Sequence, residues 1–227
     1  MSAAAPPPAS DSSRALLAHA RSLARCRRCP AVAGTPIAVV PNAPASLLLV
    51  GQAPGPREEI ERRFFAFTAG KTLFSWFARL GVAEDEFRAR VWIAAAIRCF
   101  PGRDPMGGDR APARDEIDRC SGHLERELAL LAPSTVIAVG RHAIERFLPP
   151  APLVDRVGTS FGVERGGRLV QVIPLPHPSG RSTWLADREN AARLARALEL
   201  LAESPGWRDT FGDRRPGANP RRPATYS

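Results

Sequence analysis

Four short apolar runs, separated by helical segments, constrain the fold of this chain more than any other feature. They cover residues 46–50, 91–97, 135–139 and 169–173. A short run that is almost entirely apolar is typical of a strand buried on both faces. Strands that alternate with helices indicate a parallel sheet covered on both sides. We therefore predict a three-layer α/β/α fold around a four-stranded, mostly parallel central sheet.

The predicted sheet places ligand binding at one edge, because ligands of such folds bind beyond the carboxyl ends of the strands. Four segments leave the strands there: GQAPG (residues 51–55), the segment around Cys99, Gly140-Arg141-His142, and Pro176-His177-Pro178-Ser179. Small side chains in GQAPG let the backbone approach a ligand closely, and Pro54 restricts the turn. Taken alone, GQAPG is also typical of an ordinary strand-to-helix turn. We expect the four segments to meet in one cleft.

Domain organisation follows from composition. Residues 1–12 are mostly Ala, Pro and Ser, and residues 204–227 are rich in Pro, Gly and Arg, so we expect both ends to be disordered around one domain, residues 13–203. No stretch approaches the roughly 20 apolar residues of a membrane span. The start of the chain lacks the basic and apolar regions of a secretory signal. We expect a cytoplasmic monomer without a membrane partner.

The net charge of +9 is carried almost wholly by arginine, since Lys71 is the only lysine. Such an excess of positive charge favours a polyanionic partner such as nucleic acid. A GC-rich genome would produce a similar composition, and part of the charge lies in the final segment.

The four cysteines are Cys26, Cys29, Cys99 and Cys120. In the cytoplasm they stay reduced, which makes them candidate metal ligands. Structural zinc sites usually pair one CxxC with a second, and the second is missing here. An iron–sulfur cluster with four thiolate ligands tolerates single, widely spaced cysteines better. The spacing therefore favours iron–sulfur, while zinc, or Cys99 and Cys120 as buried apolar residues, stay open.

The order of these motifs resembles the uracil-DNA glycosylase superfamily, and most closely its fourth, iron–sulfur family. The resemblance spans roughly residues 16–201. The matching motifs are GQAPG at 51–55 for a GEAPG-like loop, the acidic pair Glu58-Glu59, Phe65, Ala69-Gly70, Arg98-Cys99, Cys120 on the next helix and His177-Pro178-Ser179. The resemblance implies a monofunctional DNA glycosylase of base-excision repair, which hydrolyses the N-glycosidic bond of uracil or another deaminated base in DNA.

The resemblance also implies roles for residues of the base pocket. Phe65 matches the aromatic residue on which the flipped base stacks. His177 matches the histidine that donates a hydrogen bond to the base oxygen as the glycosidic bond breaks. Gln52 stands at the catalytic position of the GEAPG loop, and with Gly51 and Ala53 it contributes backbone to the pocket.

Cofactor and DNA contacts follow from the same comparison. The resemblance implies a [4Fe-4S] cluster on Cys26, Cys29, Cys99 and Cys120. Ser179 matches a phosphate contact. The family carries a leucine-type wedge in the loop after His177, and no leucine matches it here, so Arg181 or Trp184 would replace it.

Two pocket positions depart from the family pattern. Gln52 replaces an acidic residue, and Ala95 replaces the asparagine that reads uracil. Alanine cannot form the paired hydrogen bonds by which a carboxamide discriminates between bases. The interval from Cys99 to Cys120 is also longer than is usual in the family. Three consequences stay open: a slow enzyme, removal of another deaminated base, or a water-activating group from elsewhere, such as Glu58 or Glu59.

Two other functions fit the same sequence. One is a non-catalytic iron–sulfur protein of this fold that binds damaged DNA, which the changes at Gln52 and Ala95 favour. The other is a nucleotide-binding α/β module with a zinc site. A Schiff-base lyase step is disfavoured, because no lysine lies in the predicted cleft loops.

Overall fold

A computed structural model of the chain describes residues 11–30, 32–38, 45–179 and 183–214. Its elements are α1 (Asp11–Ala24), β1 (Leu47–Gly51), α2 (Pro56–Glu61), α3 (Thr68–Ala78), α4 (Glu84–Arg90), β2 (Trp92–Ala95), α5 (Arg114–Leu131), β3 (Thr135–Val139), α6 (Arg141–Ile144), η1 (Leu153–Asp155), β4 (Phe161–Arg165), β5 (Arg168–Leu175), η2 (Trp184–Ala186), α7 (Arg188–Glu203) and α8 (Pro205–Phe211). None of the helices in these ranges is both long and apolar enough to cross a membrane.

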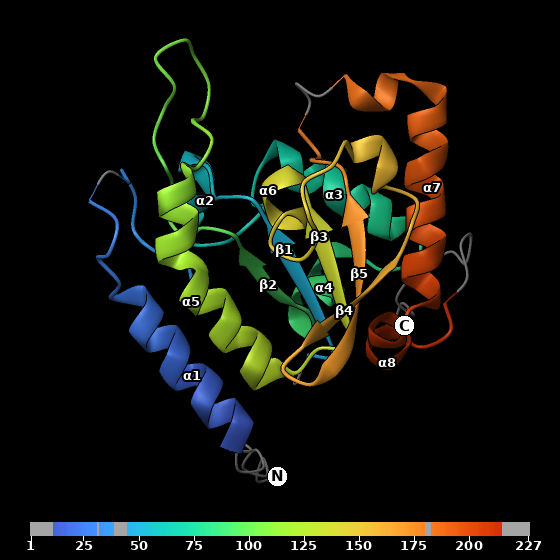
Figure 1. Cartoon of the computed structure of the whole chain (residues 1–227), viewed down its shortest axis with the longest axis horizontal. Helices are drawn as coiled ribbons and strands as arrows, with labels where there is room; N and C mark the ends of the chain where they lie inside the picture. Colours follow the sequence, from blue (N-terminus) through green and yellow to red (C-terminus); the bar gives the residue numbers. More distant parts are fainter. Residues whose placement is uncertain (1–10, 31, 39–44, 180–182, 215–227) are drawn as a thin grey trace, which may run out of the picture.

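The strands form one sheet in the order β2-β1-β3-β5-β4 (Figure 1). The first four of these run parallel, and β4 pairs with β5 in an antiparallel hairpin. The predicted α/β class with a mostly parallel sheet is confirmed, with five strands instead of four. The sequence does not predict β4, because its residues alternate between half-buried and exposed. It is an edge strand and forms no continuous apolar run.

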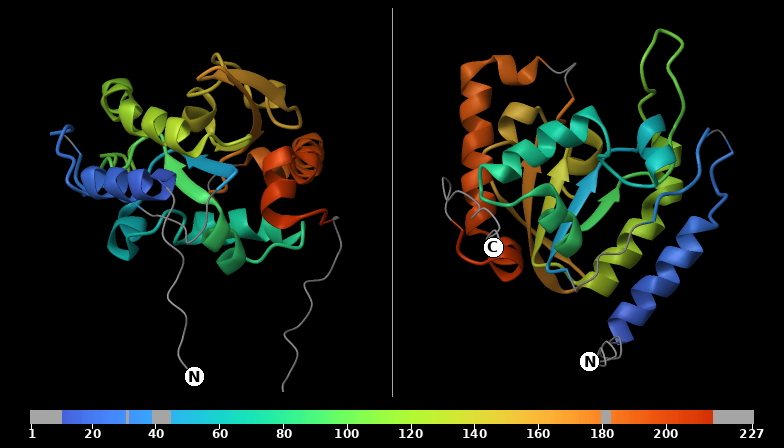
Figure 2. Two further views of the ribbon diagram at one scale, coloured as in Figure 1. Left: turned by 90° about the horizontal axis from the view of Figure 1, so that it is seen from below. Right: turned by 180° about the vertical axis from the view of Figure 1, so that it is seen from behind.

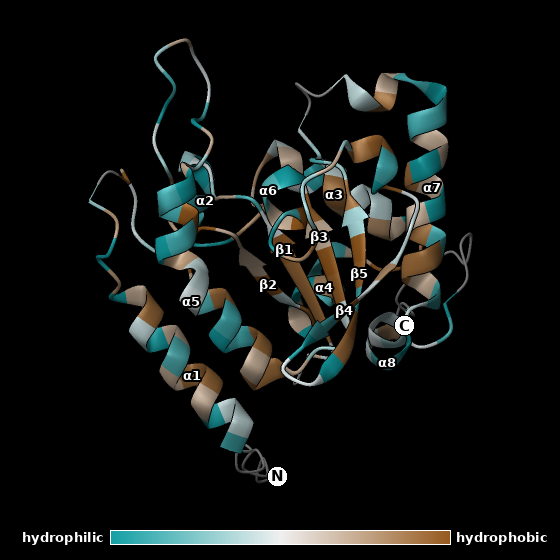
Figure 3. Ribbon diagram, viewed as in Figure 1, coloured by the Kyte–Doolittle hydropathy of each residue, from teal (hydrophilic) through white to brown (hydrophobic). Residues whose placement is uncertain are grey.

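Alternate residues of the strands pack against different helices. Leu47 and Leu49 of β1 belong to a core cluster with residues of α3, α4, α7 and α8. Leu48 and Val50 belong to a second cluster with residues of α1, α5 and α6. Figure 2 shows the helices on both sides of the sheet, and Figure 3 shows the apolar strands between them. The strands are therefore buried on both faces, as their near-continuous apolar runs predict.

The segment after α7 corrects the prediction that residues 204–227 are disordered. Residues 205–211 form α8, and the Ser204 hydroxyl accepts a hydrogen bond from the Trp207 backbone N–H. Trp207 is fully buried, with its ring centroid 4.7 Å from that of Phe211 and 6.4 Å from that of Phe87. Two aromatic residues in a Pro- and Gly-rich segment bury enough apolar surface to order it. Residues 1–10 and 215–227 lie outside the described ranges, and α1 begins at Asp11.

The packing of Trp207 predicts a large loss of stability on its removal. Trp207→Ala should lower the free energy of unfolding by about 3–5 kcal/mol, because it leaves a cavity among Phe77, Phe87 and Phe211. Urea unfolding followed by circular dichroism measures the change. Leu169→Ala, at a side chain that is 77% exposed, should change the stability by less than about 0.5 kcal/mol. Equal stability of the two variants would show that α8 contributes little to the core.

Candidate functional site

A cleft of about 1110 Å³ opens at the carboxyl edge of the parallel strands. Its wall includes the whole GQAPG loop, residues of the segments 64–69 and 101–111, Ala95, Arg141, His177 and Ser179. The predicted meeting of GQAPG with the segment around His177 is therefore confirmed. The segment after β3 contributes Arg141 to the wall. Cys99 does not line this cleft, because the chain after β2 reaches it only from Pro101 onward.

Pairing of β1 with β2 sets the floor of the cleft. Gly51 lies opposite Ala95 in the parallel register, and the Ala96 N–H donates to the Gly51 carbonyl at 2.9 Å. Ala95 is only 1% exposed. Its methyl group offers no hydrogen bond, so this part of the floor is apolar, as the substitution for asparagine predicts.

Phe65 lines the cleft in a backbone conformation that is rare for a residue with a side chain. Its φ is 54°, in the left-handed region. A Cβ at Gly51 would lie 2.7 Å from Cζ of the Phe65 ring, and a Cβ at Gly70 would lie 1.8 Å from the Phe65 carbonyl oxygen. Both positions therefore need glycine, because the ring lies directly on the β1 backbone and the α3 backbone lies directly against Phe65. Uncommon backbone held in this way is typical of functional sites.

Arg88 holds this segment in place. Its guanidinium group donates hydrogen bonds to the carbonyls of Phe64 and Phe65 at 2.9 and 2.8 Å. It also lies over the Phe74 ring, 4.4 Å from the centroid, and pairs with Glu84 at 2.8 Å. The sequence does not predict this role of Arg88, since no local signal connects a charged helix residue with a loop more than 20 residues earlier.

His177 and Gln52 lie on either side of Gly140. A Cβ at Gly140 would lie 3.2 Å from His177 Cδ2 and 3.4 Å from Gln52 Oε1, and the φ of Gly140 is +85°. A glycine is therefore required between these two side chains. Burial lowers the pKa of His177 below its usual value of 6.5. The imidazole is thus neutral at pH 7, with one ring N–H to donate.

The two acidic residues after GQAPG have different positions. Glu58 lines the cleft, and its Oε2 accepts a hydrogen bond from the Gly55 N–H at 3.1 Å. Glu59 lies outside the cleft wall and accepts from the Thr35 N–H at 2.7 Å. Of this pair, only Glu58 belongs to the cleft wall.

The predicted DNA contacts Ser179, Trp184 and Arg181 have different positions. Ser179 lines the cleft, as does Ala53 of the predicted base pocket. Trp184 is partly buried and packs against the core cluster of α3, α4, α7 and α8, outside the cleft wall. Arg181 lies outside the described residues.

All four cysteines line a second cavity, of about 290 Å³. Burial raises the pKa of the Cys99 thiol to about 12, with a further contribution from the neighbouring Cys120, and burial also raises the pKa of Cys29 and Cys120. The described part of the chain contains no group of three or more His, Cys, Asp or Glu gathered so as to hold a metal ion. The thiols thus share a cavity without forming a single-ion site.

A buried ion pair supports the cysteine cavity from behind. Arg98 and Glu127 are 2% and 1% exposed and form two hydrogen bonds, at 2.9 and 2.6 Å. His19 of α1 approaches the Glu127 carboxylate at 3.5 Å, and its ring centroid lies 5.6 Å from that of His123. Burial lowers the pKa of His123 to about 4, so this ring is neutral. The pair joins the chain after β2 to α5 and α1, and so fixes the segments that carry all four cysteines.

Comparison with known proteins gives a consistent result. Residues 39–202 match the family model of the uracil DNA glycosylase superfamily. The chain is 30% identical over 167 residues to the Type-4 uracil-DNA glycosylase of Archaeoglobus fulgidus, covering 70% of this chain and 79% of that protein. It is 34% identical over 141 residues to the Type-4 uracil-DNA glycosylase of Sulfurisphaera tokodaii, covering 60% of each. It is 26% identical over 176 residues to that of Thermotoga maritima, covering 74% and 82%.

The contacts of Arg88 predict the effect of its removal. Arg88→Met keeps much of the packing on Phe74 but leaves the carbonyls of Phe64 and Phe65 without their donor. We expect the free energy of unfolding to fall by about 1–3 kcal/mol, as measured by urea unfolding. Arg79→Met, at an exposed arginine beside the end of α3, should leave the stability nearly unchanged. An equal effect of the two substitutions would contradict a specific role of the Arg88 hydrogen bonds.

Proposed function

This chain belongs to the uracil DNA glycosylase superfamily, and we propose that it is a monofunctional DNA glycosylase that releases uracil from DNA in base-excision repair. One observation carries the proposal: an aromatic ring held on the GQAPG backbone shares a cleft with a neutral, half-buried histidine. This is a pocket in which a base can stack on one side and receive a hydrogen bond on the other.

Phe65 provides the stacking surface. A base in duplex DNA must leave the stack before a glycosylase can reach it, at a cost of a few kcal/mol. Stacking on an aromatic side chain contributes about 1–3 kcal/mol per base. The ring is already fixed by Gly51, Gly70 and Arg88, so little side-chain freedom is lost when the base arrives.

His177 provides the stabilisation of the leaving base. Negative charge develops on the base as the glycosidic bond breaks, and a donor already aimed at the base oxygen stabilises that charge. The lowered pKa of His177 leaves the imidazole neutral at pH 7, so its ring N–H acts as the hydrogen-bond donor. Gln52, across Gly140 from His177, contributes its amide to the same part of the pocket.

Water activation is assigned to Glu58. A general base needs a carboxylate that reaches the cleft, and Glu58 meets this condition while Glu59 is engaged with Thr35. The floor at Ala95 forms no hydrogen bond with a base edge. We therefore expect weak discrimination among deaminated bases, with uracil the leading substrate.

DNA binding is supported by the charge around the cleft. Arg57, Arg103 and Arg141 line its wall together with the acidic Glu58, Asp104 and Asp109, and the whole chain carries a net charge of +9. Arginines at a cleft rim favour phosphate contacts, whose affinity falls as salt rises. Ser179 lies in the same wall and is assigned to a phosphate contact.

We further propose a [4Fe-4S] cluster on Cys26, Cys29, Cys99 and Cys120. Four thiols around one cavity of about 290 Å³ match the ligand set of such clusters. Arg28, Arg98 and Arg119 also line it, which suits the negative charge of four thiolates. The cluster would covalently join α5 to the chain segments that follow α1 and β2.

Release of uracil tests the main proposal. The purified protein should release uracil from a uracil-containing oligonucleotide, and His177→Ala should slow the release by about 10²–10³-fold through loss of the hydrogen-bond donor. His142→Ala, on α6, serves as a matched control and should keep the wild-type rate. No release of uracil, hypoxanthine or xanthine from single- or double-stranded DNA would contradict the proposal. Tight binding without release would favour the non-catalytic alternative, which the apolar floor at Ala95 supports.

Metal analysis tests the cluster. Protein purified without oxygen should contain about four iron and four sulfide per chain, with the visible absorption of such clusters. Cys99→Ala should reduce iron and sulfide together, whereas Ser121→Ala, beside Cys120 on the exposed side of α5, should not. Zinc without iron or sulfide would contradict the cluster and favour the zinc alternative.

A further inference from the structure

Between β2 and α5, residues 101–113 form a hairpin that rises beyond the carboxyl edge of the sheet (Figures 1 and 2). Arg103 and Asp109 face each other in an antiparallel bridge. The Asp104 N–H donates to the Gly108 carbonyl at 3.0 Å, and the Met106 N–H donates to the Asp104 carboxylate at 2.8 Å. Gly107 and Gly108 at the turn have φ values of +100° and +91°. The hairpin therefore has a defined turn of its own.

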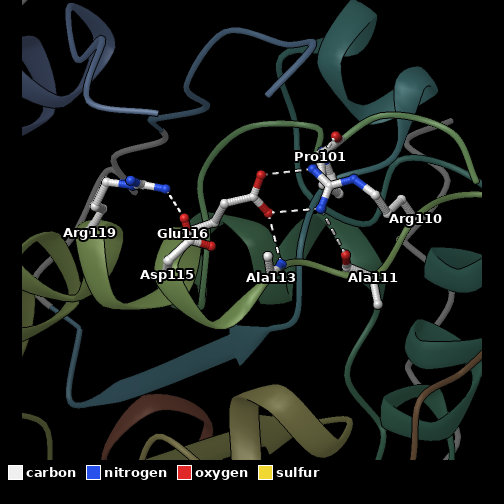
Figure 4. A network of polar contacts seen from close by, with 7 residues as sticks. All are labelled: Pro101, Arg110, Ala111, Ala113, Asp115, Glu116 and Arg119. Atoms are coloured by element: carbon white, nitrogen blue, oxygen red, sulfur yellow. Dashed lines mark hydrogen bonds and ion pairs between the residues drawn. The ribbon is translucent and has the colours of Figure 1, made fainter. Parts of the chain in front are cut away.

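The base of the hairpin is clamped to α5 (Figure 4). The Arg110 guanidinium donates to both carboxylate oxygens of Glu116, at 2.7 and 3.0 Å, and to the Pro101 carbonyl at 2.6 Å. The Glu116 side chain is buried and also accepts from the Ala113 N–H at 2.8 Å, which caps α5. A two-point bond between guanidinium and carboxylate fixes direction as well as distance. The hairpin is thus held at a set angle to the body of the protein.

Met106 occupies the tip and is 94% exposed, the largest fraction of any large apolar side chain in the described residues. It adds nothing to the core. Two other exposed apolar side chains, Ile60 and Phe67, line the cleft below. Of the six exposed large apolar side chains in the described residues, three thus lie on the hairpin or in the cleft wall, where the flat faces of bases would meet them.

The hairpin belongs to the wall of the same cleft. Arg103, Asp104 and Asp109 line it together with Phe65 and His177. A Cβ at Gly55, in the GQAPG loop, would lie 3.1 Å from the Asp109 carboxylate. The hairpin is therefore in contact with the GQAPG loop.

We propose that this hairpin is an arm that contacts DNA beside the cleft, and that Met106 at its tip is a wedge that enters the base stack of duplex substrate. The inference rests on the proposed function, since a wedge is needed where a base leaves the stack. Met is one of the apolar side chains that proteins insert between base steps. Trp184, the alternative wedge, packs against the core instead, and Met106 is free to enter a duplex without any rearrangement of the core.

A wedge acts on duplex DNA and has nothing to replace in a single strand, so the test compares both. Single-turnover release of uracil is measured from one oligonucleotide, alone and annealed to its complement. Met106→Ala should slow release from the duplex about tenfold, as expected for loss of a stacking contact, and leave release from the single strand unchanged. Leu169→Ala, at an apolar side chain of the β4–β5 hairpin that is 77% exposed, should alter neither rate. Equal rates of Met106→Ala and wild type on the duplex, or equal losses on both substrates, would overturn the proposal.

A second measurement separates this inference from the proposed function. A 2-aminopurine next to the uracil brightens when its neighbour unstacks, and this signal on binding the duplex should be weaker for Met106→Ala than for wild type. Arg110→Gln, which releases the clamp on Glu116, should weaken it likewise. A Met106-dependent signal from a protein that releases no base would overturn the glycosylase assignment and support the arm. A signal independent of Met106 from a protein that does release uracil would overturn the arm alone.

Discussion

Hydrogen bonding of β1 to β2 on one side and to β3 on the other is the constraint on which the candidate site depends. The parallel register sets Gly51 beside Ala95 and brings the GQAPG loop to the edge where β3 and β5 also end. A one-residue shift would exchange the two faces, so each side chain of β1 would meet the helices that now pack against the opposite face. The base of the cleft, at Gly51 and Ala95, is therefore part of the buried core. The loops that carry the other site residues lie at its rim.

The candidate site depends on glycines at which other groups approach the backbone closely. Glycine at 51 and 70 admits the Phe65 ring and backbone, and a Cβ at either position would clash. At Gly140, beside His177 and Gln52, a Cβ would be tight and the φ of +85° favours glycine. Arg88 then holds a left-handed Phe65 that would cost free energy on its own. The positions of Phe65, His177 and Gln52 are thus set by the protein's own packing, which suits the stacking and hydrogen bonding of a base that we propose.

The cysteine cavity and the hairpin arm flank α5. The arm is clamped to the start of α5 by Arg110 and Glu116, while Cys120 and Glu127 lie further along the helix. A cluster bound in the cavity would therefore stabilise the helix on which the arm is mounted. The proposed cluster would in this way support the proposed DNA-contacting arm through α5.

The sequence by itself determined the fold class, the strand-end cleft, GQAPG with His177 as its walls, and the superfamily, because buried runs and compact motifs are local signals. It could not reveal β4, whose alternating residues lack an apolar run, or α8, which is ordered only by burial of Trp207 and Phe211. The tertiary structure alone decided which acidic residue faces the cleft, that Trp184 packs into the core, and that Arg88 supports Phe65. Each of these depends on contacts between segments far apart in the chain, and the direction in which a side chain points there is set by packing.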